Sequence, residues 1–139
     1  MFILDTNVLS SLRRPERENT NFRDWAENKL SDDSFLSAVT ILEIEIGAAR
    51  MARKDVAQAL VFRQWIDKQV LPPFERKILP IDADIARRCA QLHVPDRRPE
   101  RDAFIAATAL THGLTVVTRN VRDFVPMGVQ TLNPWMASA

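Results

Sequence analysis

Cysteine and histidine are scarce in this chain of 139 residues, which has one cysteine and two histidines. The single cysteine, Cys89, excludes an internal disulfide and is typical of a reducing compartment, so we expect a cytoplasmic protein. Long apolar runs are also absent, because none approaches the roughly 18 residues of a membrane span. The N-terminus lacks a signal-peptide layout, since Asp5 follows only three apolar residues. We therefore expect no membrane partner.

Two catalytic motifs are missing from the sequence. There is no G-x-x-x-x-G-K-S/T loop, which disfavours nucleotide binding of the P-loop type. There is no G-x-S-x-G elbow, which disfavours serine-hydrolase chemistry. The chemistry of this chain has to be sought in other residues.

The net charge is only +1, from 19 basic and 18 acidic residues. Dedicated nucleic-acid binders usually have a strongly basic patch, so this balance alone does not indicate such a partner. Arginine suits bidentate contacts with phosphate, although solvated loops with local ion pairs explain each arginine group more simply. The groups are Arg13–Arg14, Arg87–Arg88, Arg97–Arg98–Arg101 and Arg119–Arg122.

Short apolar runs alternate with amphipathic stretches of ten or more residues along the chain. Strands are predicted at residues 2–4, 34–38, 77–81, 114–118 and 129–132. Helices are predicted at 20–30, 39–53, 55–70, from Asp82 to about 92, and at 102–113 with Gly113 as the C-cap. The alternation is typical of βαβ crossovers and predicts an α/β fold with a parallel sheet covered on both faces. We expect one domain over residues 1–139.

Acidic and amide side chains recur where ligands bind in such folds, beyond the carboxyl ends of the strands. Asp5 ends the first strand, and Asn120 and Asp123 follow "LTVVT". Glu43 lies in the first turns of the helix after "SFLSA", and Asp102 opens the helix before "LTVVT". The sequence predicts that these five side chains meet at one rim of the sheet.

Taken singly, most of these acids have structural explanations. Glu43 fits a capping box with Thr40, Asp102 would favour a helix N-terminus, and Asp123 would suit a turn. Asp5 is harder to explain in this way, because no capping pattern follows it.

Taken together, the acids would repel one another unless a cation neutralised them. Oxygen ligands without histidine or cysteine suit Mg²⁺ or Mn²⁺ and argue against zinc. Both histidines, His93 and His112, lie near predicted helix ends, where a contact with the C-terminal dipole is their expected role.

At "LDTNVLS", "SAVTILEIEIGAAR", "DAFIAATALTHGLTVVTRNVRDF" and "LNPW" the sequence resembles the PIN-domain family. More narrowly, it is similar to the VapC-type toxins of bacterial toxin–antitoxin pairs, with FitB-like and plasmid-stability members. The resemblance covers nearly the whole chain. It implies an α/β/α sandwich and a ribonuclease that depends on Mg²⁺ or Mn²⁺.

The resemblance also implies roles for single residues. Asp5, Glu43 and Asp102 match the three acids of the family's metal site. Many relatives have an aspartate where this chain has Asn120, and some use an acid at the position of Asp123, so which of the two completes the site stays open. The residues implied in substrate binding are Thr6 and Asn7 of the "DTN" turn, Thr118 and Arg119.

The partners implied by the resemblance are an RNA and a small antitoxin. Family members typically cut structured RNA such as tRNA or ribosomal RNA. A VapB-like antitoxin would place its C-terminal segment in an apolar groove, which residues 20–30 and 55–70 would border. A homodimer and an assembly with the antitoxin on promoter DNA are also implied.

Two other hypotheses were weighed against the nuclease. An aspartyl-phosphate phosphotransferase would need D-x-D after the first strand, but Asn7 stands at the second acidic position. A non-catalytic metal-binding or receiver-like module, acting through a protein partner, would need a lysine after a late strand. Arg119 stands there instead. Both observations favour the nuclease.

Overall fold

The structure is a computed structural model, and it describes residues 1–30 and 32–137. The predicted domain span of 1–139 includes residues 31, 138 and 139, which lie outside the described residues. The strands are β1 (Phe2–Leu4), β2 (Ser34–Ser37), β3 (Ile78–Leu79), β4 (Thr115–Val117) and β5 (Thr131–Leu132). The α-helices are α1 (Thr6–Ser11), α2 (Thr20–Asn28), α3 (Ala38–Lys54), α4 (Val56–Trp65), α5 (Ala83–Leu92), α6 (Glu100–His112) and α7 (Val121–Phe124). Shorter helical turns are η1 (Pro15–Arg17), η2 (Ile66–Val70) and η3 (Val125–Met127).

All five strands pair in parallel, in the order β3-β2-β1-β4-β5. The chain moves outward from β1 to β3 and then crosses to β4 and β5 on the other side. The strand order therefore reverses between β1 and β4, and ligands of such sheets bind at that point. Asp5 follows β1 and Thr118 follows β4, so both residues lie there.

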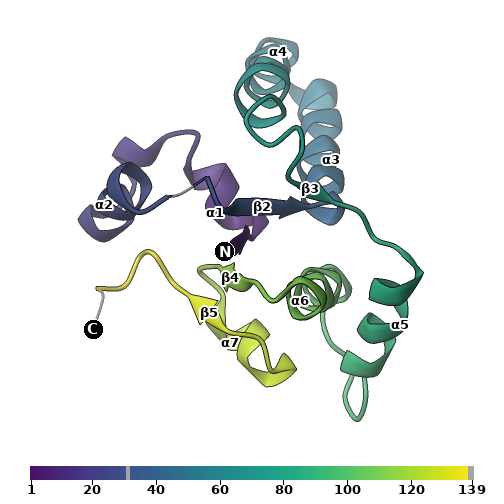
Figure 1. Ribbon diagram of the computed structural model, residues 1–139. Helices are drawn as coiled ribbons and strands as arrows, with labels where there is room; N and C mark the ends of the chain where they lie inside the picture. The colour runs from purple at the N-terminus through teal and green to yellow at the C-terminus, as the bar shows by residue number, and fades with distance from the viewer. Residues whose placement is uncertain (31, 138–139) are drawn as a thin grey trace.

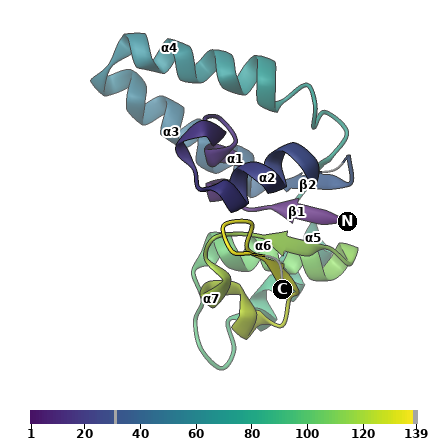
Figure 2. The same ribbon diagram turned by 90° about the vertical axis from the view of Figure 1, so that its left-hand side faces the viewer.

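Helices cover both faces of the sheet, as Figures 1 and 2 show. The core has two parts, one with side chains of α1, α2, α3 and α4 and the other with those of α5, α6 and α7. Neighbouring strand residues alternate between them: Ile3 and Val116 pack on the α6 side, and Leu4 and Val117 on the α1 side. The predicted α/β/α sandwich with a short parallel sheet is confirmed.

Capping side chains define several helix starts. The carboxylate of Asp82 accepts a hydrogen bond from Ile85 N at 2.9 Å, as the sequence predicted for α5. The amide oxygen of Asn19 accepts a hydrogen bond from Phe22 N at 2.9 Å and caps the start of α2. Gly113 ends α6 in the left-handed conformation, with φ 67°, which confirms the predicted C-cap.

Two helices were not predicted. Helix α1 follows Asp5 directly, and the Asp5 carboxylate caps it, so the expectation that no cap follows Asp5 was wrong. Helix α7 contains Asp123, which is therefore not a turn residue. The polar residues 13–21 contain η1 and the start of α2. Within the described residues, no helix is long and apolar enough to cross a membrane.

Candidate functional site

Asp5 is buried at the centre of the carboxyl rim, with only 4% of its surface exposed. Its Oδ1 accepts a hydrogen bond from Thr6 N at 2.8 Å. Its Oδ2 accepts from Thr118 Oγ1 at 2.7 Å and from Asn7 Nδ2 at 3.1 Å. Burial raises the pKa of Asp5 above its ordinary value, the charge of Glu43 adds to the rise, and the hydrogen bonds oppose it. The backbone turn and β4 thus hold this carboxylate in one orientation.

Glu43 reaches the same rim from α3. Its Oε1 accepts a hydrogen bond from Thr6 Oγ1 at 2.9 Å, and the Thr6 hydroxyl also lies 3.2 Å from Thr40 Oγ1. Helix α3 has Ser37 as its N-cap, so the capping box between Thr40 and Glu43 does not form. Thr6 therefore connects the carboxylate of Glu43 to the turn that holds Asp5.

Asp102 enters the rim from the first turn of α6. Burial raises its pKa from 3.8 to about 6, and the negative charges of Asp5, Asp123 and Glu43 contribute to the rise. No hydrogen bond or ion pair reaches the Asp102 carboxylate from any residue within 1–30 and 32–137. Asp102 is thus a partly buried acid among other acids, without a donor to stabilise its charge.

Asn120 and Asp123 follow β4 in different surroundings. The backbone N of Asn120 donates to Thr118 Oγ1 at 2.9 Å, so this residue helps to orient the Thr118 hydroxyl. Asp123, on α7, is close enough to Asp102 for its charge to raise the pKa of that carboxyl. Of the two, Asp123 is the one whose side chain contributes charge to the acidic group.

Arg101 forms an ion pair with one acid of the rim, Glu43. Its guanidinium lies 3.8 Å from Glu43 Oε2 in a half-exposed ion pair. Such a pair contributes about 0–1 kcal/mol to stability, so it offsets little of the repulsion among the four acids.

Sequence reasoning missed a link between Arg119 and the C-terminal segment. Arg119 N donates to Asn7 Oδ1 at 3.2 Å, and the Arg119 guanidinium lies 4.9 Å from the centre of the Trp135 ring. Trp135 stacks on Phe22 at 4.5 Å and donates from Nε1 to Glu18 at 2.8 Å. The indole therefore holds Arg119 against α2, and no local sequence pattern indicated this contact.

The donor chemistry of the rim fits a hard divalent cation, because the four acids supply only oxygen. As the side chains stand, however, no three His, Cys, Asp or Glu residues in the described part of the chain lie close enough together to hold one ion. The charges of neighbouring acids contribute to the raised pKa of Asp5 and of Asp102, but the four side chains do not converge on a single point. Mutual repulsion explains this spacing.

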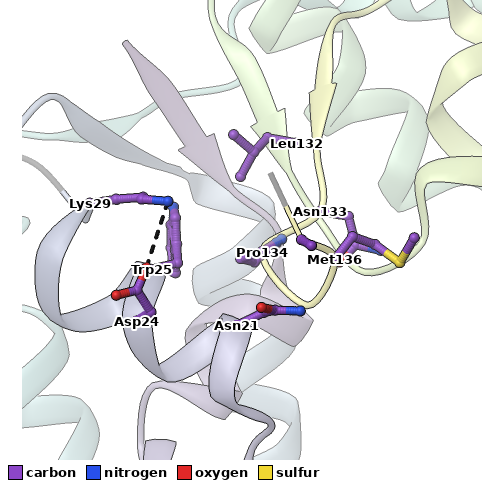
Figure 3. A pocket seen from close by; sticks show the side chains of 9 residues that line it. Asn21, Asp24, Trp25, Lys29, Leu132, Asn133, Pro134 and Met136 are labelled. Atoms are coloured by element: carbon purple, nitrogen blue, oxygen red, sulfur yellow. Dashed lines mark ion pairs between the residues drawn. The ribbon is translucent and has the colours of Figure 1, made fainter. Parts of the chain in front are cut away.

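A separate hollow of about 510 Å³ lies between α2 and the segment after β5. Figure 3 shows Trp25 and the ion pair of Asp24 with Lys29, 3.6 Å long, on one side and Asn133 with Pro134 on the other. None of the predicted site residues lines it, so it is distinct from the acidic rim.

Comparisons with known proteins identify relatives of this chain. The model of the PIN domain family matches residues 2–125. The VapC ribonuclease Y4jK of Sinorhizobium fredii is 32% identical, over 97% of this chain and 98% of the relative. The toxin FitB of Neisseria gonorrhoeae is 34% identical, over 97% of this chain and 99% of the relative. A solved structure of FitAB bound to an IR36 DNA fragment is 32% identical, covers 100% of this chain and 99% of that one, and has a TM-score of 0.88.

The family model spans most of the chain, and the relatives align over nearly their full length. The structural match extends over the same range, including the rim where Asp5, Glu43 and Asp102 gather. On these grounds the chain belongs to the PIN-domain family.

Proposed function

We propose that this protein is an endoribonuclease that depends on Mg²⁺ or Mn²⁺ and acts as the toxin of a toxin–antitoxin pair. The observation that carries the proposal is the group of four acids at the rim, where burial and the charges of the other three acids raise the pKa of Asp102 to about 6. The names of the relatives, a VapC ribonuclease and a toxin, support the activity and the biological role.

Asp5, Glu43 and Asp102 are the proposed ligands of the ion. A cation between them would remove the repulsion that now separates them, and Asp102 has no other compensating group among residues 1–30 and 32–137. We propose Asp123 rather than Asn120 as the fourth acid, because the charge of Asp123 reaches Asp102 and the backbone of Asn120 serves Thr118.

In this proposal each neighbouring residue has a positioning role. Mg²⁺ at the rim would generate a nucleophile from water at neutral pH and polarise a phosphate oxygen. Thr118 and the backbone N of Thr6 fix the two oxygens of Asp5, and the Thr6 hydroxyl fixes one oxygen of Glu43. Asn7 bridges Asp5 to the backbone of Arg119. The Trp135 ring holds the Arg119 guanidinium, which is the proposed contact for a phosphate of the RNA. A tRNA or a ribosomal RNA is the proposed substrate.

A VapB-like antitoxin is the proposed protein partner. Exposed apolar side chains on α3 and α4 offer it a surface: Leu42, Val56, Leu60 and Val61. Val56 and Leu60 lie one turn apart on α4 and share a face. We also propose that the two proteins assemble on promoter DNA with this chain as a homodimer. The solved FitAB structure, which is bound to a DNA fragment, supports a DNA-bound assembly.

Labelled tRNA, incubated with the purified protein and Mg²⁺, tests the activity. We expect cleavage that requires the added metal and is abolished by Asp5→Asn. Asp84→Asn is the matched control, because it removes the same charge from an exposed helix start far from the rim. Equal cleavage by the unsubstituted protein and by Asp5→Asn would contradict the proposal, and so would calorimetry without Mn²⁺ uptake.

A further inference from the structure

A second concave surface lies at the far end of α1, away from the acids. Two hollows of about 450 and 280 Å³ meet at Arg13 and Arg14. The larger one is lined only by polar side chains, from α1, η1 and the start of α4. The smaller one continues between Arg14 and Lys68 of η2. In Figure 2 the α1–η1 segment, in purple, lies against the α3–α4 hairpin that forms the other wall.

The basic side chains of this cleft have no acidic partners among the described residues. Arg14, Arg17 and Lys68 form no ion pair with any carboxylate in the part of the chain that the structure describes. Arg13 is held over the Phe62 ring, 5.2 Å from its centre, and also has no carboxylate. The single acid of the lining, Glu18, accepts the indole N–H of Trp135 instead. Arg13 and Arg14 are half-buried, whereas Arg17 and Lys68 are exposed. A group of cationic side chains without a counter-charge favours an anionic ligand.

The cleft is connected to the acidic rim by one short helix. Helix α1 begins directly after Asp5 and ends at Ser11, two residues before Arg13. Its six residues make it about 9 Å long, a distance that a few nucleotides of RNA cover. A chain with a phosphate at the acids would reach the arginines by following α1.

We propose that this cleft binds backbone phosphates of the RNA next to the scissile bond, through Arg14 and Arg17, with Arg13 and Lys68 as flanking charges. The inference rests on the proposed nuclease function and extends its substrate site. RNA is favoured over an amphipathic peptide segment because the larger hollow has no apolar side chain to hold the anchors of such a segment.

The test is the salt dependence of RNA binding, measured without divalent metal so that no RNA is cut. The probe is a fluorescein-labelled single-stranded RNA of about 12 nucleotides, within the range of site sizes of single-strand binding folds. Loss of two phosphate contacts lowers the slope of log affinity against log salt by about 1.4. Between about 50 and 200 mM salt, the unsubstituted protein should therefore lose about seven-fold more affinity than the double variant Arg14→Gln, Arg17→Gln.

Two further variants make the result specific. The pair Arg87→Gln, Arg88→Gln removes the same charge from α5, on the other face of the sheet, and should keep the unsubstituted slope. The pair Arg14→Lys, Arg17→Lys should also keep it, because phosphate contacts depend on charge. An unchanged slope in the variant Arg14→Gln, Arg17→Gln would overturn the proposal. If this variant weakened the binding of the antitoxin and left the salt dependence of RNA binding unchanged, the cleft would belong to the protein partner. If the Gln pair lowers the slope but the unsubstituted protein does not cleave RNA, only the proposed nuclease activity is overturned.

Discussion

Replacing Asp102 by asparagine should stabilise the metal-free protein. A carboxyl whose pKa is 3.8 in the unfolded chain and about 6 in the fold corresponds to at most about 3 kcal/mol of destabilisation at neutral pH. Solvent screening lowers this value because Asp102 is only partly buried. Loss of a favourable charge at the start of α6 removes a further 0.3–1 kcal/mol, roughly. We expect a net gain of about 1–2 kcal/mol, or about 3–7 °C in Tm for a chain of this length.

The sign of the pH dependence follows from the raised pKa. Between pH 3.8 and about 6 the folded state holds the Asp102 proton more tightly than the unfolded state does, so stability falls as pH rises through this window. Acidification from pH 7 to pH 5 should therefore stabilise the metal-free unsubstituted protein by about 1 kcal/mol more than Asp102→Asn. Urea unfolding at both pH values measures the difference.

The matched control, Asp84→Asn, should lower the stability of the protein instead of raising it. Asp84 also lies in the first turn of a helix, α5, but it is exposed. Asp84→Asn should cost about 0.3–1 kcal/mol, because only the favourable contact with the helix dipole is lost. With saturating Mn²⁺ the unsubstituted protein should be stabilised, and Asp102→Asn should not. A metal-free Asp102→Asn variant that is less stable than the unsubstituted protein would refute the reasoning about repulsion.

Three smaller changes test the supports of the fold and the site. Thr118→Val removes a buried hydrogen bond to Asp5 and should cost about 1.5–3 kcal/mol in urea unfolding; a loss under about 0.5 kcal/mol would show that the bond is dispensable. Gly113→Ala should cost about 1–2 kcal/mol in thermal unfolding, since φ is 67° there. Gly47→Ala should instead stabilise α3 by about 0.5–1 kcal/mol, because a Cβ there meets nothing closer than 3.9 Å. Equal effects of the two glycine changes would contradict the backbone argument.

The sequence predicted the long elements well, because their apolar spacing repeats over several turns. Helix α6 is an example: it was predicted from Asp102, it begins at Glu100, and it ends at the predicted cap, Gly113. The predicted strands at 77–81 and 129–132 are shorter in the structure, since only two residues of each pair with a neighbour. Helices α1 and α7 have six and four residues, too few for a helical period to show in the sequence.

The convergence of the acids was predictable because strand ends in a parallel sheet share one rim. The spacing of their side chains was not, since it depends on hydrogen bonds from residues distant in the chain. Thr118 and Asp5 are 113 positions apart, and Thr6 and Glu43 are 37 positions apart. The contact of Arg119 with Trp135 is likewise tertiary and has no local signal.

These contacts change which of the four acids is the strongest evidence for a bound cation. The sequence made Asp5 the strongest case, because a charged residue directly after a buried strand needs compensation. The structure supplies that compensation through the backbone of Thr6 and the side chains of Thr118 and Asn7. Asp102 receives no such donor from the described residues and carries the repulsion of three other acids. The case for a divalent ion at this rim therefore depends on Asp102, and a substitution there tests it more directly than one at Asp5.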